Sequence, residues 1–181
     1  LAISITTLKS LTQMALGSEI KVKIVATNLD GSSSDSAASS SSVLYSSIPT
    51  SAVTGLAVSV VSSTQVSLTW TAQSTPGNGY SSITTYTVEY KLSSDSTWQS
   101  GNTTASSPAT ISGLTTLSTY YFRIKSTNAF GTGPTSSDSS VSATLYGIPN
   151  VPAQPTLTQT SGSTSIVVTW TAPANNGATI S

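Results

Sequence analysis

The chain has 181 residues, of which 36% are hydrophobic and only 7% are charged, and its formal net charge is +0. This length allows one to two domains with a sizeable core, and the supply of Val, Ile and Leu excludes a disordered polymer. The six basic residues are scattered, so we expect neither nucleic acid nor an anionic membrane surface as a partner. No apolar run is long enough to span a bilayer and no signal peptide is present. Because the chain begins within a repeat, we expect any such segment to lie outside it.

Cysteine and histidine are both absent. The lack of cysteine has two readings. In the first, the protein works in a reducing compartment or simply does not use cysteine; in the second, it belongs to an extracellular array whose modules build adequate cores without disulfides. Cysteine usage alone leaves both readings open.

Several positions recur after 100 residues along the chain. A repeat of this length has the size of a domain, so the chain is predicted to be a piece of a tandem array. The matched pairs are Trp70 with Trp170, Asn28 with Asn128, Gly31 with Gly131 and Pro49 with Pro149.

The first segment with a clear period lies near the N-terminus. Ile20, Val22 and Ile24 alternate with Lys21 and Lys23, which is typical of a strand that buries one face. A tract rich in serine follows over residues 31–42, and Ser and Thr are again concentrated over residues 135–142. These tracts either accept O-linked sugars or form the solvent face and loop of a strand.

Three further segments, over residues 65–71, 86–91 and 120–125, show the same alternation. Gly-, Pro-, Ser- and Asn-rich turn signals separate them, and no stretch has a convincing helical period. Short alternating strands with frequent turns predict an all-β chain of antiparallel β-sandwiches. The apolar rows are Val66, Leu68 and Trp70; Tyr86, Val88 and Tyr90; and Tyr120, Phe122 and Ile124.

In this order and spacing, the motifs of residues 49–147 resemble a complete fibronectin type III domain, an immunoglobulin-like sandwich. The resemblance rests on residues 68–70, 83–91, 97–98, 114–120 and 128–134, which are similar to strand B, strand C, strand C′, the turn into strand F and the F–G region. It implies an A-B-E sheet packed on a C-C′-F-G sheet. It also implies that Tyr120 forms the tyrosine corner of the family.

The flanking segments resemble parts of the same domain. Residues 1–48 are similar to strands E, F and G of a preceding domain, and residues 148–181 to strands A and B and the start of C of a following one. In the first, Ile20 stands where the corner tyrosine is expected and Met14 stands for Leu114, which keeps the apolar character but removes the corner hydrogen bond.

Prolines mark both expected junctions, at Ile48-Pro49 and within residues 148–152. Short linkers of this kind favour a semi-rigid rod over freely jointed beads. Partial sandwiches expose apolar faces and open strand edges. The chain is therefore either a window onto a longer array, which we favour, or two halves that complete each other between neighbouring chains.

The sequence predicts no catalytic, metal or cofactor site. The commonest general base and the thiol nucleophile are missing, and the carboxylates are scattered. Glu89 is expected to face outward as a solvated charge, like the others. The acidic residues are Glu19, Asp30, Asp35, Glu89, Asp95 and Asp138.

Aromatic residues invite a ligand-stacking interpretation. The alternation places Trp70 and Trp170 in the core, so we assign them to packing. Trp98 follows a polar stretch on an expected edge strand, where it either packs simply or contacts a glycan or neighbouring domain. Together with Tyr80 and Phe130, it is a candidate exposed aromatic contact; exposure of all three on one face would favour a binding module.

Asn102-Thr103-Thr104 is the only N-glycosylation sequon, and we expect it in the C′–E loop. Some members of the family bind receptors through an Arg-Gly-Asp tripeptide in the F–G loop. Residues 130–134 read Phe-Gly-Thr-Gly-Pro, so that activity is not carried over.

These observations favour a structural, non-catalytic segment of an extracellular or cell-surface stalk, fibre or filament. Its expected partners are neighbouring domains, copies of itself and covalent glycans. Two alternatives stay open: an adhesive module that binds glycans or proteins, and an accessory array of a larger secreted enzyme.

Overall fold

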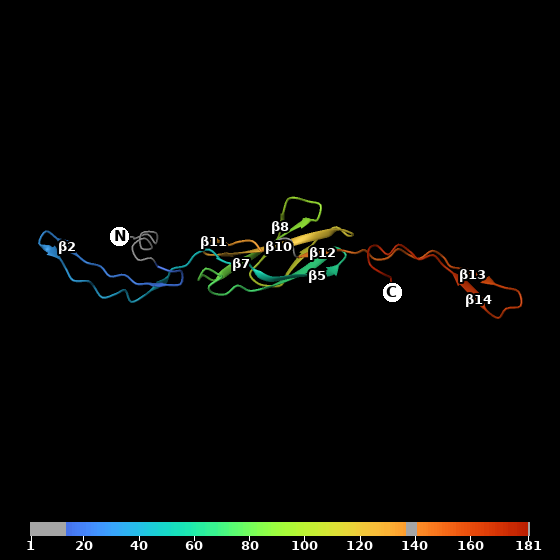
Figure 1. Cartoon of the computed structure of the whole chain (residues 1–181), viewed down its shortest axis with the longest axis horizontal. Coiled ribbons are helices and arrows are strands. Elements are labelled where there is room, and N and C mark those ends of the chain that lie inside the picture. The colour runs from blue at the N-terminus through green and yellow to red at the C-terminus, as the bar shows by residue number, and fades with distance from the viewer. Residues whose placement is uncertain (1–13, 137–140, 181) are drawn as a thin grey trace.

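The computed structural model describes residues 14–136 and 141–180, and the described chain is all-β. A central sandwich lies between two extended hairpins, one at each end of the molecule (Figure 1). The parts of the expected preceding domain and of the second Ser/Thr tract that cover residues 1–13 and 137–140 lie outside the described residues.

The central sandwich consists of two antiparallel sheets. One has the order β5-β6-β9, and the other has the order β11-β10-β7-β8, with β12 also pairing β10. They match the expected A-B-E and C-C′-F-G sheets, with strand G split into β11 and β12. The strands are β5 (Thr54–Ser62), β6 (Gln65–Thr71), β7 (Ile83–Leu92), β8 (Gln99–Thr104), β9 (Ala109–Ser112), β10 (Thr119–Asn128), β11 (Gly131–Thr132) and β12 (Ser142–Thr144).

The alternation expected from the sequence decides which face of each strand is buried. β10 shows strict alternation between buried and half-buried residues along its whole length. Trp70 of β6 packs on Tyr86 of β7, with ring centroids 5.2 Å apart, and so joins the two sheets. The core consists of Val53, Val66, Leu68, Trp70, Tyr86, Val88, Ala109, Ile111, Leu114, Tyr120, Phe122, Ile124, Ala143 and Leu145.

The tyrosine corner implied by the resemblance is confirmed. The Tyr120 hydroxyl accepts a hydrogen bond from the backbone N–H of Thr115 at 3.0 Å, while Leu114 beside it is buried. The Leu114 N–H in turn donates to the carbonyl of Thr64 at 3.0 Å. These bonds satisfy backbone groups at the crossover between the sheets and fix where β10 begins.

One strand assignment from the sequence was wrong. Residues 97–98 were expected to form strand C′, but the strand is β8 and begins only at Gln99. Trp98 therefore lies in the connection that leads into the strand.

The N-terminal hairpin repeats part of the central sandwich. Its strands are β1 (Glu19–Ile20), β2 (Thr27–Asn28), β3 (Gly31–Ser32) and β4 (Val43–Leu44). β1 pairs β4 and β2 pairs β3, as β10 pairs β12 and β11. Adding 100 to the pairs Glu19↔Leu44 and Asn28↔Gly31 gives the pairs Thr119↔Thr144 and Asn128↔Gly131.

The C-terminal hairpin corrects one prediction about the core. β13 (Thr156–Gln159) pairs β14 (Ile166–Thr169), but no second sheet covers this hairpin within the described residues. Trp170 is consequently 66% exposed, whereas Trp70 is 7% exposed. The prediction that Trp170 lies in the core was wrong. The sequence around Trp170 matches that around Trp70 and forms the same kind of strand, but a tryptophan on a strand is buried only where a second sheet faces it.

Candidate functional site

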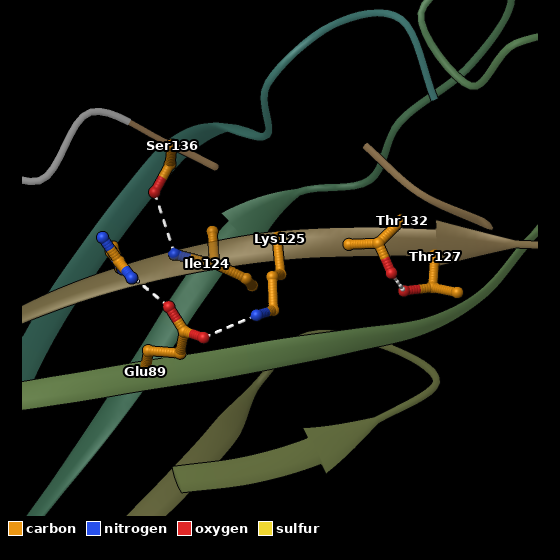
Figure 2. A network of polar contacts seen from close by, with 7 residues as sticks. Glu89, Ile124, Lys125, Thr127, Thr132 and Ser136 are labelled. Atoms are coloured by element: carbon orange, nitrogen blue, oxygen red, sulfur yellow. Dashed lines mark hydrogen bonds and ion pairs between the residues drawn. The ribbon is translucent and has the colours of Figure 1, made fainter. Parts of the chain in front are cut away.

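The outer face of the larger sheet carries a network of charges. β7 and β10 place Glu89 directly opposite Arg123. The Glu89 carboxylate accepts from Nε of Arg123 at 2.6 Å and from Nζ of Lys125 at 2.5 Å. Figure 2 shows this carboxylate between the two donors. Opposite charges on adjacent strands stabilise this pairing of β7 with β10.

Glu89 does face outward, as the alternation predicts, but it is not a freely solvated charge. Its side chain is only 12% exposed because the two cations cover it. Burial by itself would raise the pKa of Glu89, but the hydrogen bonds from Lys125 and Arg123 and their positive charges outweigh burial and hold the pKa below its ordinary value. A carboxylate kept ionised in this way is poorly suited to act as a general acid.

Trp98 completes this network. The guanidinium carbon of Arg123 lies 4.2 Å from the centroid of the Trp98 ring, and Nζ of Lys91 lies 5.0 Å from it. Arg123 is thus held between the Glu89 carboxylate and an aromatic face, and Trp98 is half-buried. This geometry favours the packing interpretation of Trp98.

Tyr80 and Phe130 lie elsewhere in the module. Tyr80 is half-buried in the loop between β6 and β7, whereas Phe130 is 52% exposed in the tight turn between β10 and β11. The described structure therefore does not bring these two rings onto the sheet face that carries Trp98. Phe130 is the most exposed of the three candidate aromatic contacts.

Asn102 lies within β8, not in the C′–E loop as expected. It is exposed, and its Nδ2 donates to the Thr110 carbonyl of β9 at 3.4 Å. A hollow of about 330 Å³ runs between these two sheet edges, lined by Tyr90, Ser100, Gly101, Asn102, Thr110, Ile111 and Ser112. The sequon is thus accessible from solvent, and its glycosylation stays a prediction.

The serines of the first tract have a structural role that the sequence did not reveal. Ser33, Ser36 and Ser39 each use both the N–H and the hydroxyl to bond the facing segment between β1 and β2, at Ala26, Ile24 and Val22. Ser36, for example, donates its N–H to the Ile24 carbonyl and accepts the Ile24 N–H on its hydroxyl, at 2.9 and 3.0 Å. This supports the strand interpretation of the tract.

The same arrangement occurs in the central sandwich. Ser136 donates its N–H to the Ile124 carbonyl at 2.8 Å. Its hydroxyl accepts the Ile124 N–H at 2.9 Å, the bond drawn in Figure 2. Here the serine is buried. Its hydroxyl satisfies a core backbone group where β11 and β12 leave a gap in strand G.

A second group of polar contacts holds the segment that enters the central sandwich. Residues 77–79 and Asn128 bond to the linker, residues 47–50, and we call these contacts the linker clamp. The Ser47 N–H donates to the Gly79 carbonyl and the Thr50 N–H to the Gly77 carbonyl, both at 2.9 Å. Nδ2 of Asn128 donates to the carbonyls of Ser47 and Asn78, at 2.7 and 2.9 Å.

Glycines make this close approach possible. A Cβ added at Gly79 would lie 2.3 Å from the Ile48 carbonyl oxygen, and one added at Gly133 would lie 2.5 Å from Cβ of Pro49. Pro49 itself is fully buried. The sequence marked Pro49 as a repeated junction residue and Asn128 as a repeated residue of the F–G region; the clamp explains why these residue types stand there.

No group of three or more His, Cys, Asp or Glu residues that could hold a metal ion occurs within residues 14–136 and 141–180. The same described residues contain no helix long and apolar enough to cross a membrane.

A family model described as "Fibronectin type III domain" matches residues 51–142. Among solved structures, the chain is similar to domains A168-A170 from titin, with 28% identity and a TM-score of 0.50, over 55% of this chain and 33% of that one. It is also similar to the chicken CNTN1 FN1-FN3 domains, with 22% identity and a TM-score of 0.46, over 69% and 42%. The match to the third fibronectin III domain of human KIAA0343 has 20% identity and a TM-score of 0.48, over 62% and 92%. The chain thus spans about a third of the titin structure.

Replacing Glu89 by Gln tests the charge network. At pH 7 we expect Glu89→Gln to lower the free energy of unfolding by about 1–3 kcal/mol. The remaining amide oxygen keeps one hydrogen bond without its negative charge, and the other bond is lost because the amide nitrogen of Gln cannot accept. The lowered pKa of Glu89 stabilises the fold above the ordinary carboxyl pKa, and this contribution is lost as the pH falls through the folded-state value. Urea unfolding at pH 7 and pH 3 should therefore show a difference that shrinks in acid. An equal difference at both pH values would contradict the account.

Replacing Asn128 by Asp tests the linker clamp. The Asp oxygen still accepts the Phe130 N–H, but the two bonds to Ser47 and Asn78 are lost and a negative charge faces their carbonyls. We expect a loss of about 2–4 kcal/mol in urea unfolding. The matched control is Asn102→Asp, which changes an exposed side chain and should cost less than about 0.5 kcal/mol. Similar losses in both variants would argue against the clamp.

Proposed function

Since the chain belongs to the fibronectin type III family, we propose that it is a structural, non-catalytic segment of an extracellular stalk, fibre or surface filament. The family and the fold support a module of the structural or adhesive type. The extracellular location, the filament and the covalent glycans are the further parts of the proposal.

The observation that carries the proposal is the repetition of strand register. The backbone pairs of the N-terminal hairpin recur in the central sandwich with every number raised by 100. A hairpin with this register belongs to an F–G unit of a second sandwich of the same kind. On this basis we assign residues 1–48, 49–147 and 148–181 to a partial, a complete and a partial module.

The linker clamp supports a spacer role. A stalk transmits position only if its junctions resist bending, and a linker whose backbone groups are bonded to the next module has little conformational freedom. The low charge of the chain supports the extracellular, glycosylated part of the proposal less directly. A neutral surface gains solubility from covalent glycans, for which Asn102 is the candidate attachment site.

Two measurements on native material test this function together. Electron microscopy should show unbranched filaments one module wide, and intact mass with glycopeptide mapping should give a parent built from repeats and show whether Asn102 carries sugar. A compact particle with contacts between non-adjacent modules would overturn the stalk.

The adhesive alternative has its own readout. Binding of the chain to a glycan array, lost in Phe130→Ala and retained in Tyr121→Ala, would favour adhesion over a spacer role. Absence of binding in the unmodified chain favours the structural role.

A further inference from the structure

The chain contains two junctions built on the same plan. At the first, the Ser47 N–H donates to the Gly79 carbonyl, and the Thr50 N–H to that of Gly77. At the second, 100 residues on, the Gly147 N–H donates to the Asn176 carbonyl and the Asn150 N–H to that of Ala174, at 2.9 and 3.0 Å. In each case a linker is bonded to the loop that follows the second strand of the next module.

The first junction packs an aromatic ring on a glycine. Gly17 belongs to the turn before β1, and Tyr80 belongs to the loop of the central sandwich. A Cβ added at Gly17 would lie 2.4 Å from Cε1 of Tyr80 and 2.5 Å from Cζ. Ser46 in the linker donates its hydroxyl to the Tyr80 carbonyl at 2.8 Å, which fixes the backbone that carries the ring.

At the second junction the large side chains precede the junction and the glycine follows it, the reverse of the first junction. Gly177 now stands in the loop of the following segment, and Leu117 and Tyr146 approach it from the central sandwich and linker. A Cβ added at Gly177 would lie 2.7 Å from Cδ1 of Tyr146 and 3.3 Å from Cδ2 of Leu117. The ring again lies on a glycine across the junction, but it comes from the other side.

The backbone follows the same bonding plan at both junctions, and the side chains at the contact differ in size. Gly17 and Leu117, which are 100 residues apart, both have positive φ, 86° and 61°. The loop residues Tyr80 and Gly177 also both have positive φ, 59° and 95°. Leu and Tyr are disfavoured in this region, so their presence there is explained by the volume that they supply at the contact.

We propose that this contact is a size-matched docking surface for a neighbouring module of the same chain and decides which module can follow which. The inference rests on the proposed tandem array. A module with Leu117 and Tyr146 at its end would force large side chains against a loop that carries Tyr80, and overpacking of this kind is destabilising. A module with Gly17 before a loop with Gly177 would leave a void. Each junction therefore accepts its own combination.

The test enlarges the glycine of the first junction and then converts the whole set. In the full chain, Gly17→Leu should drive the new side chain into the Tyr80 ring. The triple variant Gly17→Leu, Ser46→Tyr, Tyr80→Gly installs the residues of the second junction and should fit. The readout is amide hydrogen exchange at position 17 and at Ser47, measured by NMR as protection factors so that the intrinsic difference between Gly and Leu is removed, with Phe122 as an internal reference in the core. We expect exchange at least about tenfold faster in the single variant and recovery in the triple variant.

The matched control is Gly113→Leu. Gly113 also has a positive φ, 77°, but a Cβ there has no atom within 4 Å, so this variant imposes similar backbone strain without a clash. It should leave Gly17 and Ser47 exchange unchanged. Unprotected amides in the unmodified chain, no effect of Gly17→Leu, or no recovery in the triple variant would each overturn the inference. These outcomes concern the junction alone; the proposed array is tested separately by the mass and imaging of the native material.

Discussion

The pairing of β10 with β7 is the interaction on which the rest of this module depends. One row of β10 side chains, Tyr120, Phe122 and Ile124, forms the centre of the core. The opposite row places Arg123 and Lys125 on Glu89 of β7. The tyrosine corner anchors the start of β10, and Asn128, the last residue of β10, binds the linker that enters the module. A slip of one residue would exchange the two rows and remove all of these contacts at once.

This dependence links the core of a module to the geometry of the chain. Asn128 is 4% exposed and reaches the linker from the end of a strand whose position the core fixes. The linker is therefore positioned by the interior of the module as well as by its surface loops. A neutral chain with few charges has little long-range electrostatic force to orient its modules, so short-range hydrogen bonds and close packing of glycines have to do so.

The period-2 pattern of the sequence predicted which side chains of each strand are buried. It could not predict contacts between residues that lie far apart along the chain. The alternation identified the core rows of β6, β7 and β10, and the resemblance to the fibronectin type III domain implied the corner at Tyr120. The burial of Trp170 could not be inferred in the same way, because its neighbouring residues predict a strand but not the presence of a facing sheet. Neither the position of Asn102 in β8 nor the cations that cover Glu89 could be predicted, since both depend on cross-strand register. The 100-residue match of Asn28 and Asn128 was a signal for the clamp, but its meaning required the linker carbonyl beside it.

The central claim is that the modules follow one another through clamped junctions, so that their mutual orientation is fixed. Since the chain has no cysteine, two introduced cysteines can carry spin labels without interference. The most direct measurement is the distance distribution by double electron–electron resonance between labels at Ser59 and Thr158, both on exposed strand positions on either side of the second junction. A single narrow distribution is predicted. A broad distribution, as freely jointed modules give, would contradict the account.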